Sequence, residues 1–279
     1  MPELPEVETV RRDLVRHVLG RCVVTVEVTG RRSVRRQDPV EFAGALRGRT
    51  IESVSRRGKY LFATLDDAAL LVVHLRMSGQ LLLVPSGAST PREPHTHVVL
   101  GLDDVSELRF VDPRTFGELF VTSDLGPDGR PAALGALGVD PLVDPIDGRV
   151  VRELLAGRRT TLKALLLDQR AIAGIGNLYA DEICFRAQLR PDRRTDSIGI
   201  SAATRLWRAV VEVLDDAVAA RGSTLRDARY RDLHGGHGHY QRSHAVYGRA
   251  GEACTVCGTP IERARIAGRS AHYCPRCQR

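Results

Sequence analysis

The chain begins Met-Pro-Glu-Leu-Pro-Glu, which places a proline and two carboxylates directly after the initiator methionine. Removal of Met1 would leave Pro2 with a free secondary amine, close in sequence to Glu3 and Glu6. Such an amine can serve as a nucleophile in covalent catalysis. At this point two interpretations stay open: a dispensable chain end, or a nucleophile with its own carboxylates.

Two further residue types stand out by their rarity. Lys59 and Lys163 are the only lysines among 41 basic side chains. A lysine differs from an arginine because its compact ammonium group can lose a proton. We interpret the two lysines as positions that need this chemistry, with chance retention as the alternative. Met77 is the only methionine after Met1, and its default interpretation is a flexible filler of the core.

Four cysteines near the C-terminus have the spacing of a zinc site. Cys254 and Cys257 form one Cys-x2-Cys pair, and sixteen residues separate it from the pair Cys274 and Cys277. Two such pairs supply the four thiolates of a closed, structural zinc site. Two disulfides are the alternative, which a cytosolic chain disfavours. We predict one structural zinc ion and a hairpin between the pairs, with Arg269 at its tip.

A glycine-rich turn lies between two helical patterns in the stretch DQRAIAGIGNLYADE. Asn177 opens the second pattern, and asparagine is a favoured N-cap residue. The exposed amides of a helix N-terminus bind anions. A phosphate site at Asn177 and an ordinary helical hairpin are equally open interpretations.

The surrounding elements follow from the sequence pattern. Apolar residues recur at helical spacing over 5–19, and short alternating segments separated by turns fill 21–125. This pattern predicts a β-sandwich or barrel-like domain with a helix at its start. The stretch 85–94 is expected to be a loop, and the Gly-, Pro- and Asp-rich passage 126–148 a linker. Helical patterns follow, and the cysteine module comes last.

Composition limits the classes of function. The chain has 279 residues and a formal net charge of +7, which favours a polyanionic partner. No apolar run reaches the roughly 18 residues that a membrane helix needs, and the N-terminus lacks the apolar segment of a signal peptide. We therefore expect a cytoplasmic protein that does not bind membranes.

The motifs together resemble one family. MPELPEVETV at the start, RRGKYL at 56–61, HLRMSGQL at 74–81 and DPRTFG at 112–117 are followed by LLLDQRAIAGIGNLYADE, VYGR and the cysteine module. In this order they resemble the bacterial formamidopyrimidine-DNA glycosylases, enzymes that repair 8-oxoguanine, over essentially the whole chain. A base cannot be attacked inside the stack, so such enzymes extrude the damaged nucleotide into a pocket.

The resemblance implies an α+β fold in which an N-terminal β-sandwich with a flanking helix precedes a helical domain with a helix–two-turn–helix element and a four-cysteine zinc finger. We accordingly expect a catalytic domain at 1–130, a linker at 131–148, the helical domain with the lesion-binding loop at 149–240, and the zinc finger at 241–279. The implied partner is double-stranded DNA containing oxidised bases. No small-molecule cofactor is expected, and a monomer suffices.

The resemblance also assigns roles to the catalytic residues. Pro2 matches the nucleophile that attacks the sugar, provided that Met1 is removed, and Glu3 matches the general acid. Glu6 would order the amine and the helix start. Lys59 matches the family's strand lysine, which assists β-elimination, and Arg269 matches the residue associated with δ-elimination. The resulting activity is excision of oxidised purines followed by strand cleavage through β,δ-elimination.

A second set of residues matches DNA contacts of the family. Met77, Arg114 and Phe116 match the side chains that fill the hole left by the extruded base, which replaces the core-filler interpretation of Met77. Asn177 matches a phosphate ligand. The complete set of implied DNA-binding positions is His74, Met77, His95, Arg114, Phe116, Arg158, Lys163 and Asn177.

Some positions depart from the family pattern. Arg76 stands where glycine is usual, and Arg221 replaces the first residue of a usual Gly-Gly pair before the lesion-binding loop. Within that region the stretch 234–244 is histidine-rich, and Ser243 stands at an often apolar position. These departures bear on loop conformation and lesion preference, whereas the catalytic set is intact.

Three alternatives remain at this stage. A related endonuclease VIII-like enzyme would use the same nucleophile on oxidised pyrimidines. A catalytically inactive protein could bind damaged DNA through the zinc and helical elements alone. An amino-terminal-proline tautomerase, which acts on small molecules, would need neither the zinc hairpin nor the phosphate sites.

Overall fold

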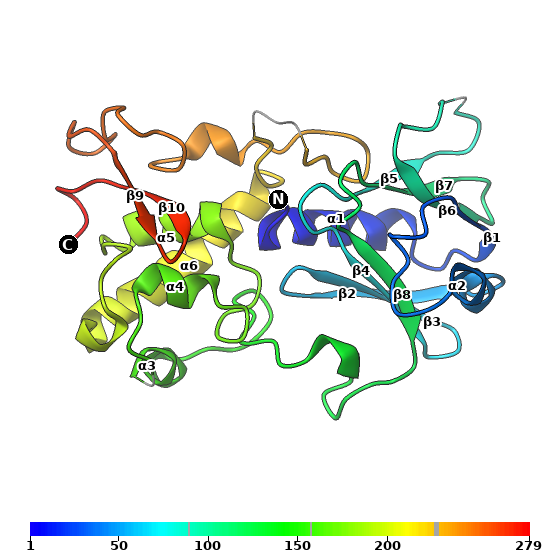
Figure 1. Cartoon of the computed structure of the whole chain (residues 1–279), viewed down its shortest axis with the longest axis horizontal. Helices are drawn as coiled ribbons and strands as arrows, with labels where there is room; N and C mark the ends of the chain where they lie inside the picture. The colour runs from blue at the N-terminus through cyan, green and yellow to red at the C-terminus, as the bar shows by residue number, and fades with distance from the viewer. Residues whose placement is uncertain (89, 157, 226–228) are drawn as a thin grey trace. The chain divides into compact units, whose positions relative to one another are not determined.

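The computed structural model describes residues 1–88, 90–156, 158–225 and 229–279, and the chain forms two compact units. The N-terminal unit contains residues 1–135 and 221–239, and the C-terminal unit contains 136–220 and 240–279. Figure 1 labels the helices and strands of both units. The segment 221–239, expected in the helical domain, groups with the N-terminal unit. Residue 89 of the expected loop lies outside the described residues, as do residues 157 and 226–228 of the expected helical domain.

The N-terminal unit begins with helix α1 (Leu4–His17), close to the predicted range. Pro5 lies in the first turn, where its missing amide hydrogen costs nothing. Val7, Val10 and Leu14 lie on one face of the helix and are buried. α1 therefore packs against β2 and β3 while its N-terminal end holds the candidate nucleophile.

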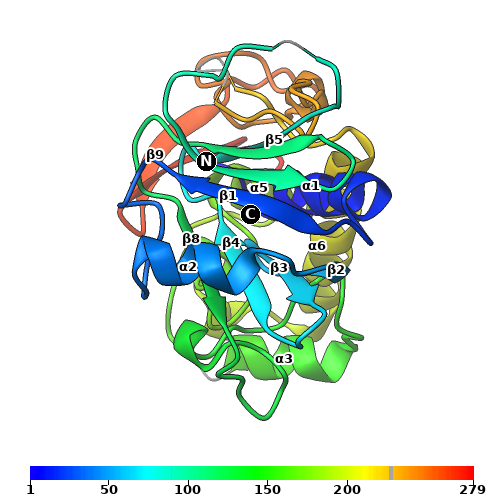
Figure 2. The same cartoon turned by 90° about the vertical axis from the view of Figure 1, so that its right-hand side faces the viewer.

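Among the described residues of this unit, eight antiparallel strands form two four-stranded sheets, with strand orders β1-β6-β7-β5 and β2-β3-β4-β8. Figure 2 shows the two layers, with helix α2 (Pro39–Leu46) beside them. The strands are β1 (Val23–Val28), β2 (Ile51–Arg57), β3 (Tyr60–Leu65), β4 (Leu70–His74), β5 (Gln80–Val84), β6 (Thr96–Leu102), β7 (Glu107–Val111) and β8 (Glu118–Thr122). The predicted β-sandwich with a helix at its start is confirmed.

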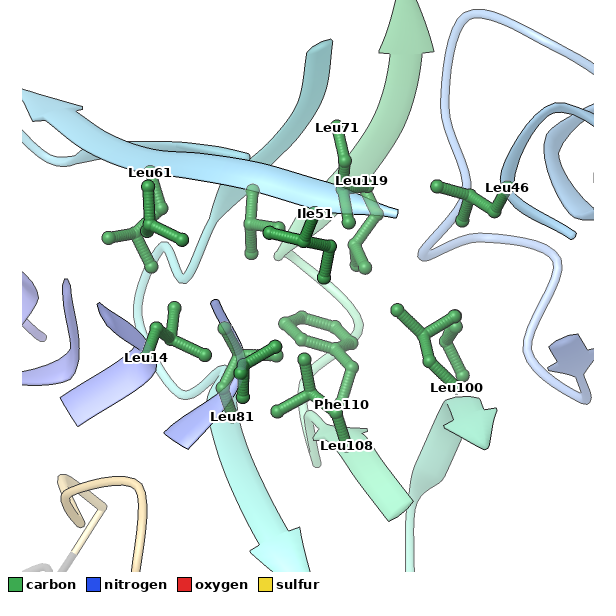
Figure 3. Close-up of a cluster of buried hydrophobic side chains, with 14 of the residues drawn as sticks. Leu14, Leu46, Ile51, Leu61, Leu71, Leu81, Leu100, Leu108, Phe110 and Leu119 are labelled. Atoms are coloured by element: carbon green, nitrogen blue, oxygen red, sulfur yellow. The ribbon is translucent and has the colours of Figure 1, made fainter. Parts of the chain in front are cut away.

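The space between the two sheets is filled largely by branched aliphatic side chains, which lie around the ring of Phe110 in Figure 3. Leu61 and Leu119 come from one sheet, Leu108 and Phe110 come from the other, and each is at most 5% exposed. Burial of a side chain of this size contributes about 1.5–3 kcal/mol. The core therefore fixes the sheets firmly, and the loops at their ends can carry the site.

The C-terminal unit is helical up to its final module. Its helices are α3 (Gly148–Ala156), α4 (Leu162–Leu167), α5 (Asn177–Arg186) and α6 (Ile200–Ala219), with short 3-10 turns at Ala132–Leu134 in the first unit and at Thr195–Ser197 and Tyr240–Ser243 in this one. α6 is amphipathic and packs against α3 and α5. Among the helices formed by the described residues, none has the length and hydrophobicity that crossing a bilayer requires.

The chain ends in the predicted hairpin, in which β9 (Glu262–Ile266) pairs with β10 (Arg269–Tyr273). Ala267 and Gly268 form the two-residue turn with φ angles of 50° and 74°. Two positive φ angles define the hairpin turn that matches the twist of paired strands. β10 contacts α5, so the hairpin is attached to the helical part of its own unit.

Candidate functional site

The N-terminal segment is held by one buried carboxylate. Pro2 is buried, and Glu3 is the N-cap residue of α1. Glu6 accepts a hydrogen bond from the backbone N–H of Glu3 at 2.7 Å. Its other oxygen accepts from the backbone N–H of Ser223 at 2.8 Å, and the residue is only 2% exposed. Glu6 therefore connects the backbone of Glu3, the residue after Pro2, to the backbone of Ser223.

Lys59 lies in the two-residue turn that joins β2 to β3, and not within a strand as the resemblance implied. Gly58 provides the positive φ angle of 56° that the turn requires. The guanidinium of Arg56 donates to the Gly58 carbonyl at 2.9 Å and to the carboxylate of Glu8 on α1 at 3.1 Å. The turn that carries Lys59 is thus bonded to the helix that carries the N-terminus.

Glu8 keeps its charge in this arrangement. Burial by itself would raise its pKa, but hydrogen bonds from Arg11 and Arg12 and the charge of Arg56 outweigh burial and lower the pKa of Glu8 to about 2. The carboxylate is therefore ionised throughout the physiological range. The charged carboxylate of Glu8 therefore accepts from Arg56, the arginine that supports the Lys59 turn, throughout this pH range.

His74 ends strand β4 and is only 7% exposed. Its ring meets the ring of Tyr60 edge-on at 4.3 Å between centroids. Burial, with smaller contributions from the charges of Arg76 and Lys59, lowers the pKa of His74 to about 3. Its Nδ1 faces the backbone N–H of Arg76 at 2.8 Å, so the neutral ring accepts there and holds its proton on Nε2.

Arg76 departs from the family pattern, and its backbone shows why glycine suits the position. Its φ angle is 52°, in the left-handed region. The guanidinium reaches Glu118 on β8 at 3.3 Å, which ties the loop after β4 to the neighbouring strand. The substitution therefore adds a contact between the loop and the sheet.

The three predicted hole-filling residues lie on two loops of the N-terminal unit. Met77 is 38% exposed and Phe116 is 46% exposed, so both apolar side chains are accessible to a partner. The guanidinium of Arg114 lies 4.7 Å from the centre of the Phe116 ring. This distance is typical of a cation–π contact, which pre-orders the cation and the aromatic ring.

Asp112 connects these two loops, and the sequence analysis did not identify it. It is fully buried, and it accepts hydrogen bonds from the hydroxyl of Ser78 at 2.5 Å and from the backbone N–H of Gly117 at 2.7 Å. It also accepts from the backbone N–H of Arg114 at 3.2 Å. The Asp-Pro pair at this position indicates a turn. Only the tertiary structure shows that Asp112 also bonds Ser78, the residue that follows Met77.

Two predicted DNA contacts lie on connecting segments. His95 is exposed just before β6 with a φ angle of 67°, and its carbonyl accepts from the backbone N–H of Asp112. Arg158 follows α3 in the C-terminal unit, pairs with Asp168 and is 37% exposed. Both side chains reach solvent, as a contact with DNA requires.

Arg269 and Asn177 line one hollow of the C-terminal unit. Arg269 is exposed at the end of the hairpin turn, and Arg263 and Arg265 line the same hollow. Asn177 is not the N-cap residue, which is Gly176, but the first residue of α5. Its amide nitrogen lies 3.4 Å from the Ser270 hydroxyl, and its buried Oδ1 has no hydrogen-bond partner among the described residues.

Lys163 was expected to contact DNA, but its side chain has no exposed surface. Its ammonium lies 2.5 Å from a carboxylate oxygen of Asp181 and 2.5 Å from the carbonyl of Ser270. The other oxygen of Asp181 faces the backbone N–H of His272 at 2.9 Å and its ring Nδ1 at 3.0 Å. Lys163 and Asp181 therefore hold strand β10 at Ser270 and His272, just after Arg269. Lys163 thus positions the strand that carries Arg269, and the expected contact of its own side chain with DNA is not available.

Glu182 is a second buried acidic residue whose partners come from a distant part of the chain. Its carboxylate accepts backbone hydrogen bonds from Ala245, Val246 and Tyr247 at 2.8–3.0 Å. Burial raises its pKa, although the three backbone donors oppose that shift. Glu182 thus attaches the VYGR motif to α5. Its partners are more than sixty residues away, so no local pattern indicates them.

The four predicted zinc ligands converge. The sulfur atoms of Cys254, Cys257, Cys274 and Cys277 all lie within 4.8 Å of one another. The shortest distances are 3.5 Å between Cys257 and Cys274 and 3.9 Å between Cys254 and Cys277. Tetrahedral zinc with bonds of about 2.3 Å needs sulfurs about 3.8 Å apart. The site therefore fits one zinc ion.

Three family models match the chain in succession. Residues 1–119 match the formamidopyrimidine-DNA glycosylase N-terminal domain, and residues 137–229 match the formamidopyrimidine-DNA glycosylase H2TH domain. Residues 251–279 match the zinc finger found in FPG and IleRS. Together these matches cover most of the chain, in the order that the motifs predict.

Curated relatives and solved structures are similar over full length. Formamidopyrimidine-DNA glycosylases of Symbiobacterium thermophilum and Geobacillus kaustophilus are 45% and 44% identical, with all of this chain covered and 89% and 100% of theirs. The crystal structure of MutM (Fpg) from Thermus thermophilus is 42% identical, with a TM-score of 0.85 and coverage of 99% and 98%. Wild-type Lactococcus lactis Fpg bound to DNA containing N7-benzyl-Fapy-dG is 35% identical, with a TM-score of 0.89 and full coverage of both chains.

Proposed function

Since this chain belongs to the formamidopyrimidine-DNA glycosylase family, we propose a specific division of the reaction among its residues. The protein is a DNA glycosylase with AP lyase activity that acts in base excision repair. Its substrates are oxidised purines, 8-oxoguanine and formamidopyrimidines, in duplex DNA. The endonuclease VIII-like and inactive alternatives become outcomes of the experiment described below.

Pro2 is the proposed nucleophile once Met1 has been removed. An α-amino group has an ordinary pKa of about 7.7–8.0, so a useful fraction is unprotonated near neutral pH. Its lone pair bonds to C1′ of the sugar, and the bond from C1′ to the base breaks with its electron pair leaving on the base. The proline nitrogen gives up its proton, and the departing base takes up a proton. Glu3 protonates the ring oxygen as the C1′–O4′ bond opens, and a cationic iminium results.

The iminium then serves as an electron sink for strand cleavage. Loss of a proton from C2′ expels the phosphate at C3′, and a second elimination expels the phosphate at C5′. Lys59 assists the first elimination, and Arg269 with Asn177 binds the phosphate near the lesion. Backbone and guanidinium donors of this kind stabilise the charge of a departing phosphate.

Met77, Arg114 and Phe116 fill the hole that the extruded nucleotide leaves. Their exposed apolar surface supports this role, because insertion between base steps would bury it. Neutral His74 donates from Nε2, and His95 and Arg158 donate as well, to phosphates along the strand. Lys163 contributes by holding the Arg269 hairpin.

One structural zinc ion is bound by the four cysteines of the zinc finger. Its site is closed, so the metal supplies folding free energy and takes no part in the reaction. We further propose that the protein acts in the cytoplasm at the nucleoid, where its substrate is found.

The observation that supports the proposal most directly is the arrangement around Pro2. Glu6 is nearly inaccessible, and it holds the backbone of Glu3 with one oxygen and Ser223 with the other. A dispensable chain end would not need a buried carboxylate with two backbone donors, since such a group is costly to desolvate.

The experiment is covalent trapping on two substrates. Duplexes containing 8-oxoguanine or an oxidised pyrimidine are incubated with the protein and reduced with borohydride. We expect a cross-linked adduct in higher yield with 8-oxoguanine, and a Pro2→Gly variant that loses most of it. A preference for the pyrimidine duplex would support the endonuclease VIII-like alternative. No adduct on either duplex would support the inactive or the tautomerase alternative.

A further inference from the structure

Helix α1 presents two buried carboxylates on one face. Glu6 and Asp13 are seven residues apart, which is close to two helical turns, and each is 2% exposed. Both bind the same short segment that follows α6. Glu6 accepts the backbone N–H of Ser223, and Asp13 pairs with the guanidinium of Arg221.

The segment has no room to shift against Glu6. Gly222 has a φ angle of 78°, and a Cβ atom added there would lie 2.8 Å from the side chain of Glu6. The turn therefore lies in direct contact with the carboxylate that also holds Glu3. A displacement of the turn would be passed to the residues next to Pro2.

Arg221 fixes this turn from two sides. Its guanidinium pairs with Asp13 on α1 and donates from Nε and Nη2 to one oxygen of Asp232 at 3.0 and 2.7 Å. The other oxygen of Asp232 accepts the backbone N–H groups of His234 and Gly236 at 3.0 and 2.7 Å. Arg221 thus connects α1 to Asp232 and, through Asp232, to the backbone of residues 234 and 236.

The ion pairs of Arg221 are formed by a residue whose backbone is strained. Its φ angle is 59°, in the left-handed region where a side chain is disfavoured and glycine is at ease. Strained positions persist when surrounding contacts hold them, and they cluster at functional sites. Here two buried carboxylates supply those contacts.

We propose that Arg221 is a positioning residue for catalysis, acting through Glu6 to hold Glu3 and Pro2 in reactive geometry. This inference rests on the proposed function of Pro2. Small displacements of reacting groups cost about 100-fold in rate. Arg221→Gly relieves the backbone strain but removes the guanidinium partner of two buried carboxylates, Asp13 and Asp232, so the rates are compared at a temperature where a melting curve shows the variant to be folded.

The test is single-turnover excision of 8-oxoguanine together with the rate of borohydride-trapped adduct. We expect Arg221→Gly to slow both by about 10- to 100-fold, with DNA affinity unchanged within about twofold. The matched control is Gln188→Gly. Gln188 also has a positive φ angle, 56°, so glycine relieves backbone strain there as well, but its side chain is exposed. This variant should behave as wild type.

A double variant separates positioning from a general structural effect. If Arg221 acts through Glu6, Glu6→Gln with Arg221→Gly should be no slower than Glu6→Gln alone. Independent, multiplying losses would overturn the proposal, as would wild-type rates in Arg221→Gly. If the wild-type protein itself forms no adduct, the proposed function of Pro2 fails instead, and the two failures are thereby distinguished.

Discussion

At the scale of single residues, the two lysines show how the surroundings of a side chain decide its role, since both are buried, with Lys59 8% and Lys163 0% exposed. Lys59 lies in a turn that buried Arg56 supports, whereas Lys163 is fully enclosed with Asp181. A charge in the interior persists only when it is paired. The same side chain is therefore proposed as a reactive group in one place and acts as a structural anchor in the other.

Lys163→Met should destabilise the protein by about 3–5 kcal/mol, because the change leaves Asp181 buried with an uncompensated charge. Chemical denaturation of the zinc-loaded protein measures the effect. Arg149→Met is the control, since Arg149 and Glu153 form a pair in which both side chains are more than half exposed. That variant should lose no more than about 0.5 kcal/mol. Equal effects would refute the anchoring role of Lys163.

The depressed pKa of His74 makes a pH prediction. The unfolded chain binds a proton near the ordinary value of 6.5, whereas the folded protein does so only near 3. The unfolded state therefore binds more protons in this window, and stability falls as pH decreases from 6.5 toward 3. The slope from this residue is at most about 1.4 kcal/mol per pH unit. Denaturation at pH 7 and pH 5 should show a smaller difference in His74→Gln than in wild type.

At the scale of elements, loops and strand ends gather the site while buried carboxylates join them. Asp112 joins the Met77 loop to the loop of Arg114 and Phe116, and Glu182 joins α5 to the VYGR motif. In each case one acidic side chain satisfies several backbone donors that a loop leaves open. These carboxylates give irregular segments a single conformation.

Asp112→Asn should reduce excision of 8-oxoguanine by about 10- to 100-fold, because the hole-filling side chains lose their common support. Asp104→Asn is the matched control, since Asp104 accepts from the hydroxyl of Ser106 at 2.5 Å in a turn between β6 and β7. Its activity should stay near wild type. Single-turnover rates compare the two variants, and similar losses in both would contradict a specific role for Asp112.

At the scale of the whole molecule, each of the two units carries its own set of proposed functional residues. The N-terminal unit contains the proposed nucleophile and the exposed side chains proposed to fill the hole in the DNA, and its core consists of two packed sheets. The zinc finger of the C-terminal unit has only a small buried cluster around Val246, Cys254 and Cys274. A module with so small a core depends on its metal for folding.

Cys254→Ala should therefore unfold the hairpin and abolish binding to lesion-containing DNA, while the sandwich keeps its structure. Zinc content, gel-shift affinity and hydrogen exchange of the β-sheet amides measure the three effects. Cys184→Ala is the control, because Cys184 is fully buried in α5 and apart from the metal ligands. Normal DNA binding by Cys254→Ala would show that the zinc finger is not needed for recognition.

Local patterns in the sequence were sufficient for several features. Short stretches of the sequence indicate four features: the zinc ligands, helix α1, the alternating strands and the N-terminal proline. In each case the spacing of a few residues reflects local geometry. Long-range partners were not readable in this way. The burial of Lys163 against Asp181, the position of Asn177 after the N-cap, and the junctions at Asp112, Glu182 and Arg221 were decided by the tertiary structure. Each depends on groups brought together from distant parts of the chain, up to 208 residues apart for Arg221 and Asp13, and only folding places such groups within hydrogen-bonding distance.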